Sequence, residues 1–151
     1  MLRSLTKTWS LAGLRVGYAL GAPELLARLA ARRSHWPLGT LQLEAIAACC
    51  TTEAVAEARA DAQRLAALRA DMAGALTGLG LDVVDGCAPF VLFAVPDAAL
   101  MRKHLAARGI AVRRCDTFIG LGRGGMGDGY LRAAVRPEWP ALVEAVEELL
   151  R

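Results

Sequence analysis

The pattern of hydrophobic and polar positions predicts a chain in which short strands alternate with helices. Five short apolar runs bounded by glycine, proline or charged residues indicate strands. They cover residues 16–21, 81–85, 89–95, 110–114 and 130–135, and residues 2–6 are expected to form the end of a further strand. Apolar residues three and four positions apart indicate helices. These begin near residues 22, 41, 53, 98 and 137. The alternation predicts an α/β fold.

The two helices predicted at the centre of the chain differ in their pattern. Residues 41–50 are almost entirely apolar, so this helix is expected to be buried. The longer helix, residues 53–79, has apolar residues at helical spacing with charged residues between them. Its apolar positions are Val55, Ala58, Ala62, Leu65, Leu68, Met72, Leu76 and Leu79. It is therefore expected to bury one face and to expose the other.

Composition adds that the chain can build a core of its own. Of 151 residues, 55% are hydrophobic and 22% are charged, and the net charge is only +3. The arginines are scattered among acids, so nucleic acid is not an expected partner. Arginines also interrupt every apolar run before the ~18 residues that a membrane span needs. Neither a membrane anchor nor a signal peptide is therefore expected.

The four cysteines do not have the spacing of a metal site. Cys49 and Cys50 are adjacent, whereas Cys87 and Cys115 are isolated. No Cys-x-x-Cys or matching histidine accompanies them, so no zinc or other metal is expected. Buried free thiols in the reducing cytoplasm are the simplest interpretation.

Two further segments leave alternatives open. His35 could act as an acid or base or line a channel, or it could be a loop histidine beside an anchoring Trp36. Residues 122–129 contain a formal Gly-x-Gly-x-x-Gly pattern. A dinucleotide site would need a strand before this pattern and a helix after it. Here a strand follows, so a hairpin-like connection is predicted instead.

Lys7 stands out because lysine is scarce in this chain. The other lysine is Lys103. A lysine among small and apolar neighbours is a candidate nucleophile, since burial favours its neutral amine. The alternative is an exposed lysine at a strand end.

The residues around Lys7 resemble the pyridoxal-phosphate (PLP) lysine segment of fold type I aminotransferases. Ser-x-x-Lys is followed by Leu-x-Gly-Leu-Arg-x-Gly-Tyr within residues 4–18. The resemblance implies that Lys7 binds PLP as a Schiff base and then moves the Cα proton of the substrate. It also implies that Ser4 and Arg15 bind the cofactor phosphate, with Thr6 as a helper. Hydroxyl and guanidinium donors suit a phosphate dianion, and a primary amine suits an aldehyde.

The resemblance extends to a strand near the C-terminus. Leu131-Arg132-Ala133-Ala134-Val135 matches the apolar-Arg-apolar-x-apolar pattern of the family, and departs from it at Arg136, where the family has glycine. The resemblance implies that Arg132 binds the substrate α-carboxylate. The alternative is an ion-paired strand arginine.

The resemblance covers essentially all of this chain, but only the C-terminal part of the family's. It implies the C-terminal part of the PLP-dependent transferase fold. Residues 1–48 would be a remnant of the large PLP-binding domain, and residues 49–151 the small C-terminal α/β domain. Three interpretations of the chain stay open: it is a fragment, it is the product of a misplaced gene start, or it is a degenerate remnant of the family.

Residues 4–7 and 112–121 look most like the cobalamin-pathway threonine-phosphate decarboxylase group, with histidinol-phosphate aminotransferases as close relatives. The expected function is that of a cytoplasmic, homodimeric PLP enzyme acting on an amino acid or amino-phosphate. Transamination and decarboxylation both stay open, because substrate orientation over the cofactor decides between them. The alternative is a truncated non-catalytic domain that serves only in assembly or dimerisation.

Overall fold

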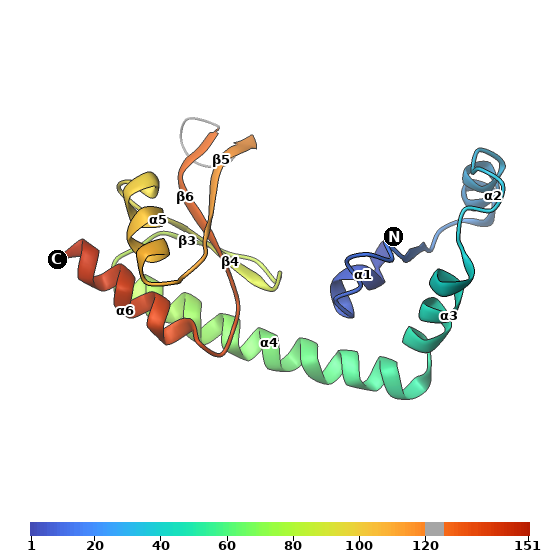
Figure 1. The fold of residues 1–151 in the computed structure, drawn as a ribbon, viewed down its shortest axis with the longest axis horizontal. Coiled ribbons are helices and arrows are strands. Elements are labelled where there is room, and N and C mark those ends of the chain that lie inside the picture. The colour runs from blue at the N-terminus through green and yellow to red at the C-terminus, as the bar shows by residue number, and fades with distance from the viewer. Residues whose placement is uncertain (120–125) are drawn as a thin grey trace. The chain divides into compact units, whose positions relative to one another are not determined.

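The computed structural model describes residues 1–119 and 126–151 of the chain (Figure 1). Two compact units, Met1–Asp61 and Ala62–Arg151, divide the chain between them. The boundary falls inside α4 (Thr52–Gly78), so this helix contributes residues to both units. No helix in the described part of the chain is long and apolar enough to cross a membrane.

A β-hairpin begins the first unit. β1 (Leu2–Ser4) pairs antiparallel with β2 (Gly17–Ala19), and the short helix α1 (Leu5–Thr8) begins the loop between them. Helix α2 (Pro23–Ala31) has its proline in the first turn, where a missing backbone N–H removes no intrahelical bond. Helix α3 (Thr40–Cys49) follows.

Four antiparallel strands form the sheet of the second unit, in the order β3-β4-β6-β5. The strands are β3 (Val83–Val84), β4 (Phe90–Ala94), β5 (Arg113–Ile119) and β6 (Met126–Ala134). Helices α5 (Ala98–Ala107) and α6 (Trp139–Leu150) pack against the sheet together with the C-terminal half of α4. Asp97 caps α5 by accepting hydrogen bonds from the amides of Ala99 and Leu100.

The core of this unit lies between the sheet and these helices. Alternate residues of the two central strands supply one side of it, as the two-residue period of a strand requires. They are Val91, Phe93 and Val95 with Leu131, Ala133 and Val135. The helices supply Met72, Leu76, Met101, Leu105, Leu142 and Val146. The intervening strand residues, including Leu92 and Arg132, are only partly buried and belong to the other face of the sheet.

The predicted order of strands and helices is confirmed except at Leu5 and Thr6, which belong to the short helix α1 and not to the predicted strand end. The predicted burial of residues 41–50 is wrong. Helix α3 has no buried residue, and the side chains of Leu41 and Leu43 are 74% and 54% exposed. Similarly, α4 contacts the core only from Leu65 onward, whereas Val55 is exposed. Apolar composition predicts burial only where another segment covers the helix. No described segment buries these positions.

The loop and the cysteines also differ from expectation. Trp36 is 94% exposed, so it does not anchor the loop that contains His35. Of the four free cysteines, only Cys115 is buried, while Cys50 and Cys87 are exposed. The vicinal pair therefore does not pack in a core, because it ends the uncovered helix α3.

The glycine-rich segment connects two paired strands. β5 and β6 run antiparallel, with irregular register between Arg114 and Ile119. Residues 126–129, which were predicted to belong to the connection, are already part of β6, so the pattern ends in a strand rather than a helix. Residues 120–125, which hold much of the Gly-x-Gly-x-x-Gly pattern, lie outside the described residues.

Candidate functional site

Lys7 lies on α1, in the loop that joins the two strands of the N-terminal hairpin. Its side chain is exposed rather than buried, which corrects the expectation of an apolar setting. Buried Leu5 and Thr6 precede it and hold α1 against the hairpin. The lysine is thus presented to solvent from an anchored turn.

Thr6 closes this loop through its hydroxyl group. The Oγ1 atom donates to the carbonyl oxygen of Val16 at 3.2 Å and accepts from the amide of Val16 at 3.1 Å. The Thr6 amide also donates to the Val16 carbonyl at 3.2 Å. Both residues are buried. Because its single hydroxyl proton is already engaged, Thr6 holds the loop in this structure and has no hydroxyl proton left for a ligand.

Arg15 immediately precedes this contact in a left-handed backbone conformation, with φ = 52°. Such a conformation is unfavourable for a residue with a Cβ atom, by about 1–2 kcal/mol. Strained backbone of this kind concentrates at functional sites, where the surrounding contacts hold it in place. Here the hydrogen bonds between Thr6 and Val16 hold it.

Gly17 lets the two strands of the hairpin approach closely beside Ser4. The two residues are register partners, so they face the same side of the strand pair. A Cβ atom at Gly17 would lie 2.5 Å from the carbonyl oxygen of Arg3 and 3.3 Å from the Cα of Ser4. Glycine is therefore required for the close approach of the two strands.

An open concavity of about 480 Å³ lies over this hairpin. It brings together Ser4, Thr6 and Arg15, three of the residues singled out from the sequence. Its remaining lining residues are Leu2, Arg3, Val16, Gly17, Tyr18 and Ala19. No aspartate or glutamate is among these lining residues, all of which belong to the described part of the chain. Arginine and hydroxyl donors without a carboxylate form a site that favours an anion.

Arg132 lies on β6 in the second unit. Its guanidinium carbon lies 5.0 Å from the centre of the Phe90 ring, a cation–π contact. None of the ion pairs found among residues 1–119 and 126–151 involves Arg132. The structure therefore does not support the alternative of an ion-paired strand arginine.

The sequence reasoning missed Arg113 as a partner of Arg132. The two residues are register partners on β5 and β6, so both belong to the face of the sheet opposite the core. The Arg113 guanidinium lies 5.2 Å from the centre of the Phe118 ring, whereas Arg114 pairs with Asp116 at 2.9 Å. Two like charges side by side repel each other unless an anion compensates them. The sequence signal that could have identified Arg113 was the alternation of residues along the strand around Val112-Arg113-Arg114.

Cys115 lies beside this arginine pair and is completely buried. Burial raises the pKa of its thiol above the ordinary value of 9.0, and the charges of Arg132 and Arg113 oppose part of this rise. The thiol therefore stays protonated at neutral pH. A neutral, inaccessible thiol is a packing group rather than a nucleophile.

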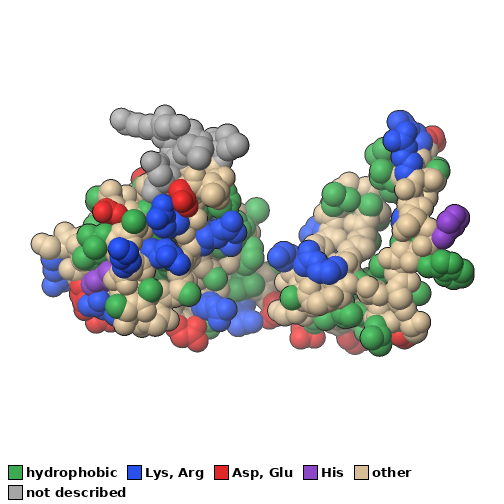
Figure 2. Space-filling model, turned by 45° about the horizontal axis from the view of Figure 1, so that its top comes forward, with side chains coloured by type: hydrophobic (Ala, Val, Ile, Leu, Met, Phe, Trp, Pro, Cys, Tyr) green, Lys and Arg blue, Asp and Glu red, His purple; other side chains and the backbone are tan. Residues whose placement is uncertain are grey.

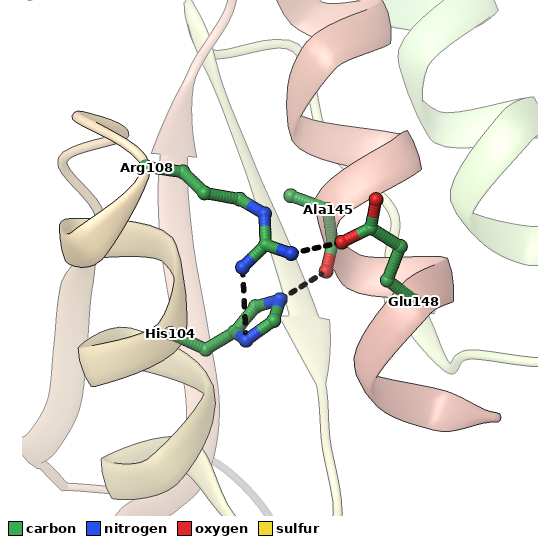
Figure 3. Close-up of polar contacts among 4 residues, drawn as sticks. All are labelled: His104, Arg108, Ala145 and Glu148. Atoms are coloured by element: carbon green, nitrogen blue, oxygen red, sulfur yellow. Dashed lines mark hydrogen bonds and ion pairs between the residues drawn. The ribbon is translucent and has the colours of Figure 1, made fainter.

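His104 belongs to a separate polar cluster between α5 and α6 (Figure 3). Its Nε2 atom lies 2.9 Å from the carbonyl oxygen of Ala145, and its Nδ1 atom lies 3.1 Å from Arg108, which also pairs with Glu148. The arginine can only donate, so Nδ1 accepts and Nε2–H donates. The cluster joins two helices, and the prediction of a partly exposed helix histidine is confirmed.

Within the described residues, no group of three histidine, cysteine, aspartate or glutamate side chains is placed to hold a metal ion. The site chemistry is instead that of two cationic surfaces. One is the acid-free concavity over the N-terminal hairpin, whose lining residues do not include Lys7, and the other is the arginine pair on the second sheet.

Comparison with known proteins identifies the family of this fold and site. The sequence model of the aminotransferase class I and II family matches residues 1–139. The chain belongs to this family, whose members use pyridoxal phosphate. Lys7 and the acid-free concavity with Ser4 and Arg15 fit the amine and phosphate contacts that this cofactor requires.

A histidinol-phosphate aminotransferase of Mycobacterium tuberculosis is 66% identical to this chain over 148 residues. The match covers 98% of this chain but 39% of the mycobacterial protein. Among solved structures, a putative aminotransferase from Burkholderia pseudomallei has a TM-score of 0.81 at 31% identity, over 99% of this chain and 44% of that one. The L-threonine-O-3-phosphate decarboxylase of Porphyromonas gingivalis has a TM-score of 0.75 at 25% identity, over 99% and 46%. The chain thus spans about two fifths of the length of the curated relatives it matches.

Proposed function

We propose that this chain forms part of a PLP-dependent enzyme that acts on an amino acid or amino-phosphate. The observation that carries the proposal is the acid-free concavity that Ser4 and Arg15 line together, on the hairpin whose connecting loop contains Lys7. The family membership supports the same assignment. In this proposal, residues 1–48 contribute to the cofactor-binding domain and residues 49–151 form the small C-terminal domain.

The proposed roles follow from the donor chemistry of each residue. Lys7 would hold the cofactor through its primary amine, and the same amine would carry the proton at the substrate Cα. The Ser4 hydroxyl and the Arg15 guanidinium hold the phosphate. Thr6 positions Lys7 and Arg15 by closing the loop at Val16. Pyridoxal phosphate, when bound, accepts the electron pair of the bond broken at Cα.

Arg132 is the proposed contact for the substrate carboxylate. With Arg113 beside it, the same sheet face can hold a second anionic group, such as the phosphate of an amino-phosphate. The names of the relatives, histidinol-phosphate aminotransferase and threonine-phosphate decarboxylase, agree with such a substrate. A decarboxylase would be a lyase of cobalamin biosynthesis, and an aminotransferase would be a transferase.

We further propose a cytoplasmic homodimer as the working form. The four free cysteines suit a reducing compartment. Figure 2 shows hydrophobic side chains on the surface of the first unit, and those of α3 include Leu41 and Leu43. Apolar surface of this kind is characteristic of an interface. The second candidate function, a non-catalytic assembly module, rests on the same apolar surface.

Covalent trapping of PLP tests the proposal. The purified chain is mixed with PLP, reduced with borohydride and mapped by mass spectrometry. We expect one PLP adduct on Lys7 in the wild type and none on that peptide in the Lys7→Ala variant, because only a primary amine forms the reducible bond. Lys103, on α5, is the internal control for non-specific labelling of an exposed lysine.

Equal labelling of Lys7 and Lys103, or no adduct at all, would favour the assembly module. If Lys7 is labelled, histidinol phosphate and threonine O-phosphate are compared as substrates. Release of CO₂ from threonine O-phosphate indicates a decarboxylase. Transfer of the amino group from histidinol phosphate to a 2-oxo acid indicates an aminotransferase.

A further inference from the structure

Phe90 lies against Arg132, the residue proposed above to contact the substrate carboxylate. We infer that Phe90 is a positioning residue, which holds the Arg132 guanidinium where its N–H groups can bind a carboxylate. Phe90 thereby determines how strongly this face of the sheet prefers a ligand that has a carboxylate. The inference rests on the proposed function, since it concerns the role given there to Arg132. The sequence motif around Arg132 does not include Phe90.

The strand register places Phe90 within reach of Arg132 on the same face of the sheet. Leu92 is the register partner of Arg132, and Phe90 is the partner of Ala134, two positions further along β6. Phe90 is therefore the diagonal neighbour of Arg132, at a separation that long side chains can bridge. The Arg132 guanidinium carbon lies 5.0 Å from the centre of the Phe90 ring, and both residues are partly buried. Two neighbouring strands thus build the contact.

Arg113 explains why Arg132 needs such a contact. It is the register partner of Arg132 on β5, so two like charges stand side by side and repel each other. The strand order β4-β6-β5 puts Phe90 on the side of Arg132 that is away from Arg113. The Arg132 guanidinium is therefore held toward β4, while that of Arg113 lies over Phe118. The ring of Phe90 separates the two charges and fixes one of them.

The contact leaves the hydrogen-bond donors of Arg132 available for a ligand. None of the arginine hydrogen bonds and ion pairs found among residues 1–119 and 126–151 involves its side chain. A carboxylate of the protein would also fix the guanidinium, but it would occupy the donor fork that a ligand carboxylate needs. An aromatic ring fixes the group without competing for this fork. An arginine that is already held also loses less conformational freedom when the ligand binds.

Two ligands that differ only in the carboxylate test this inference. Threonine O-phosphate has the carboxylate, and O-phospho-1-amino-2-propanol lacks it. NMR titration of the 151-residue chain gives both dissociation constants. We expect Phe90→Leu to weaken binding of threonine O-phosphate about threefold, because it removes a partly exposed cation–π contact. Binding of the second ligand should stay unchanged, and Phe90→Tyr, which keeps the ring, should bind both ligands like the wild type.

The Nε–Hε signal of Arg132 reports the position of the guanidinium directly. A proton over an aromatic ring is shifted upfield, so this shift should be present in the wild type and in Phe90→Tyr and absent in Phe90→Leu. Phe118→Leu is the matched control, because the Phe118 ring contacts Arg113 instead. It should leave the Arg132 signal and the ratio of the two dissociation constants unchanged. Phe90→Met replaces Phe90→Leu if that variant does not fold.

Three outcomes would overturn the inference. An equal loss of affinity for both ligands in Phe90→Leu would mean that Phe90 only supports the sheet. An unchanged affinity or an unchanged Arg132 signal in this variant would mean that the ring does not hold the guanidinium. A wild type that binds the two ligands equally, or binds neither, would mean that Arg132 contacts no carboxylate. The PLP adduct on Lys7 does not depend on any of these results, so it tests the proposed function separately.

Discussion

At the scale of single residues, the site depends on one position where a side chain is absent. Gly17 lets the carbonyl of Arg3 approach so closely that a Cβ atom would stand 2.5 Å from its oxygen. The neighbouring backbone would have to move, and with it Ser4 and the loop that holds Lys7. The resemblance marks Gly17 as part of a motif, and the structure gives the reason.

We therefore expect Gly17→Ala to disrupt the hairpin. The destabilisation of this segment should be about 2 kcal/mol, since a clash with backbone cannot be relieved by a side-chain rotation. Hydrogen exchange of the Thr6 and Val16 amides, both of which take part in the loop contact, is the local measurement. Exchange should become faster in the variant, and PLP trapping should fall.

Gly13→Ala is the control for this experiment, because no atom lies within 4 Å of the added Cβ. It should leave exchange at both amides close to that of the wild type. If Gly13→Ala and Gly17→Ala behaved alike, the close approach of the strands would not be what requires glycine.

At the scale of elements, the sequence predicted most of the helices and strands because their local patterns agree with their final environment. β4 shows this well, since its uninterrupted apolar run forms a strand with one buried face and one half-buried face. Burial of α3 was not predictable, because composition reports what a helix can bury and not what covers it. The site residues were found through their spacing around Lys7. Arg113 needed the strand register, which brings it beside Arg132 although the two are distant in the chain.

The contact between α5 and α6 yields a second prediction. His104, Arg108 and Glu148 form a chain of polar contacts that joins the two helices (Figure 3). A double-mutant cycle of His104→Leu and Glu148→Gln should show a coupling of about 0.5–1 kcal/mol, because both residues act through the same arginine. Urea denaturation of the four proteins measures it.

The pair of Arg151 and Glu147 provides the comparison for the cycle. It is a single exposed contact at the C-terminal end of α6, with the arginine side chain 73% exposed. Arg151→Gln should leave the urea midpoint unchanged, since solvent screens such pairs. Strict additivity of His104→Leu and Glu148→Gln would show that the polar chain does not couple the helices.

At the scale of the whole molecule, the buried thiol links stability to pH. The pKa of Cys115 is raised in the folded state, chiefly by burial, and that of Tyr130 is raised by burial and by its hydrogen bond to Asp82. Both groups therefore keep their proton to higher pH when folded than when unfolded. Their contribution is fully present below the unfolded pKa and is lost as the pH rises through the folded one.

We expect the free energy of unfolding to fall as the pH approaches and passes 9.0, the ordinary pKa at which the unfolded thiol ionises. The slope from Cys115 should reach up to about 1.4 kcal/mol per pH unit. Urea titrations at several pH values measure it. Cys115→Ala should be less stable overall, because it leaves a cavity, but its pH dependence near and above pH 9.0 should be weaker. An identical slope in the two proteins would mean that the thiol does not contribute.

The double contact between Thr6 and Val16 also limits which residues can precede the lysine. A group at this position must both donate and accept a hydrogen bond in a buried space of fixed size. Serine and threonine meet this requirement, whereas valine has the shape without the hydrogen bonds. The restriction comes from the loop and not from the reaction. Position 6 should therefore keep its hydroxyl even in a descendant chain that had exchanged Lys7 and lost its chemistry.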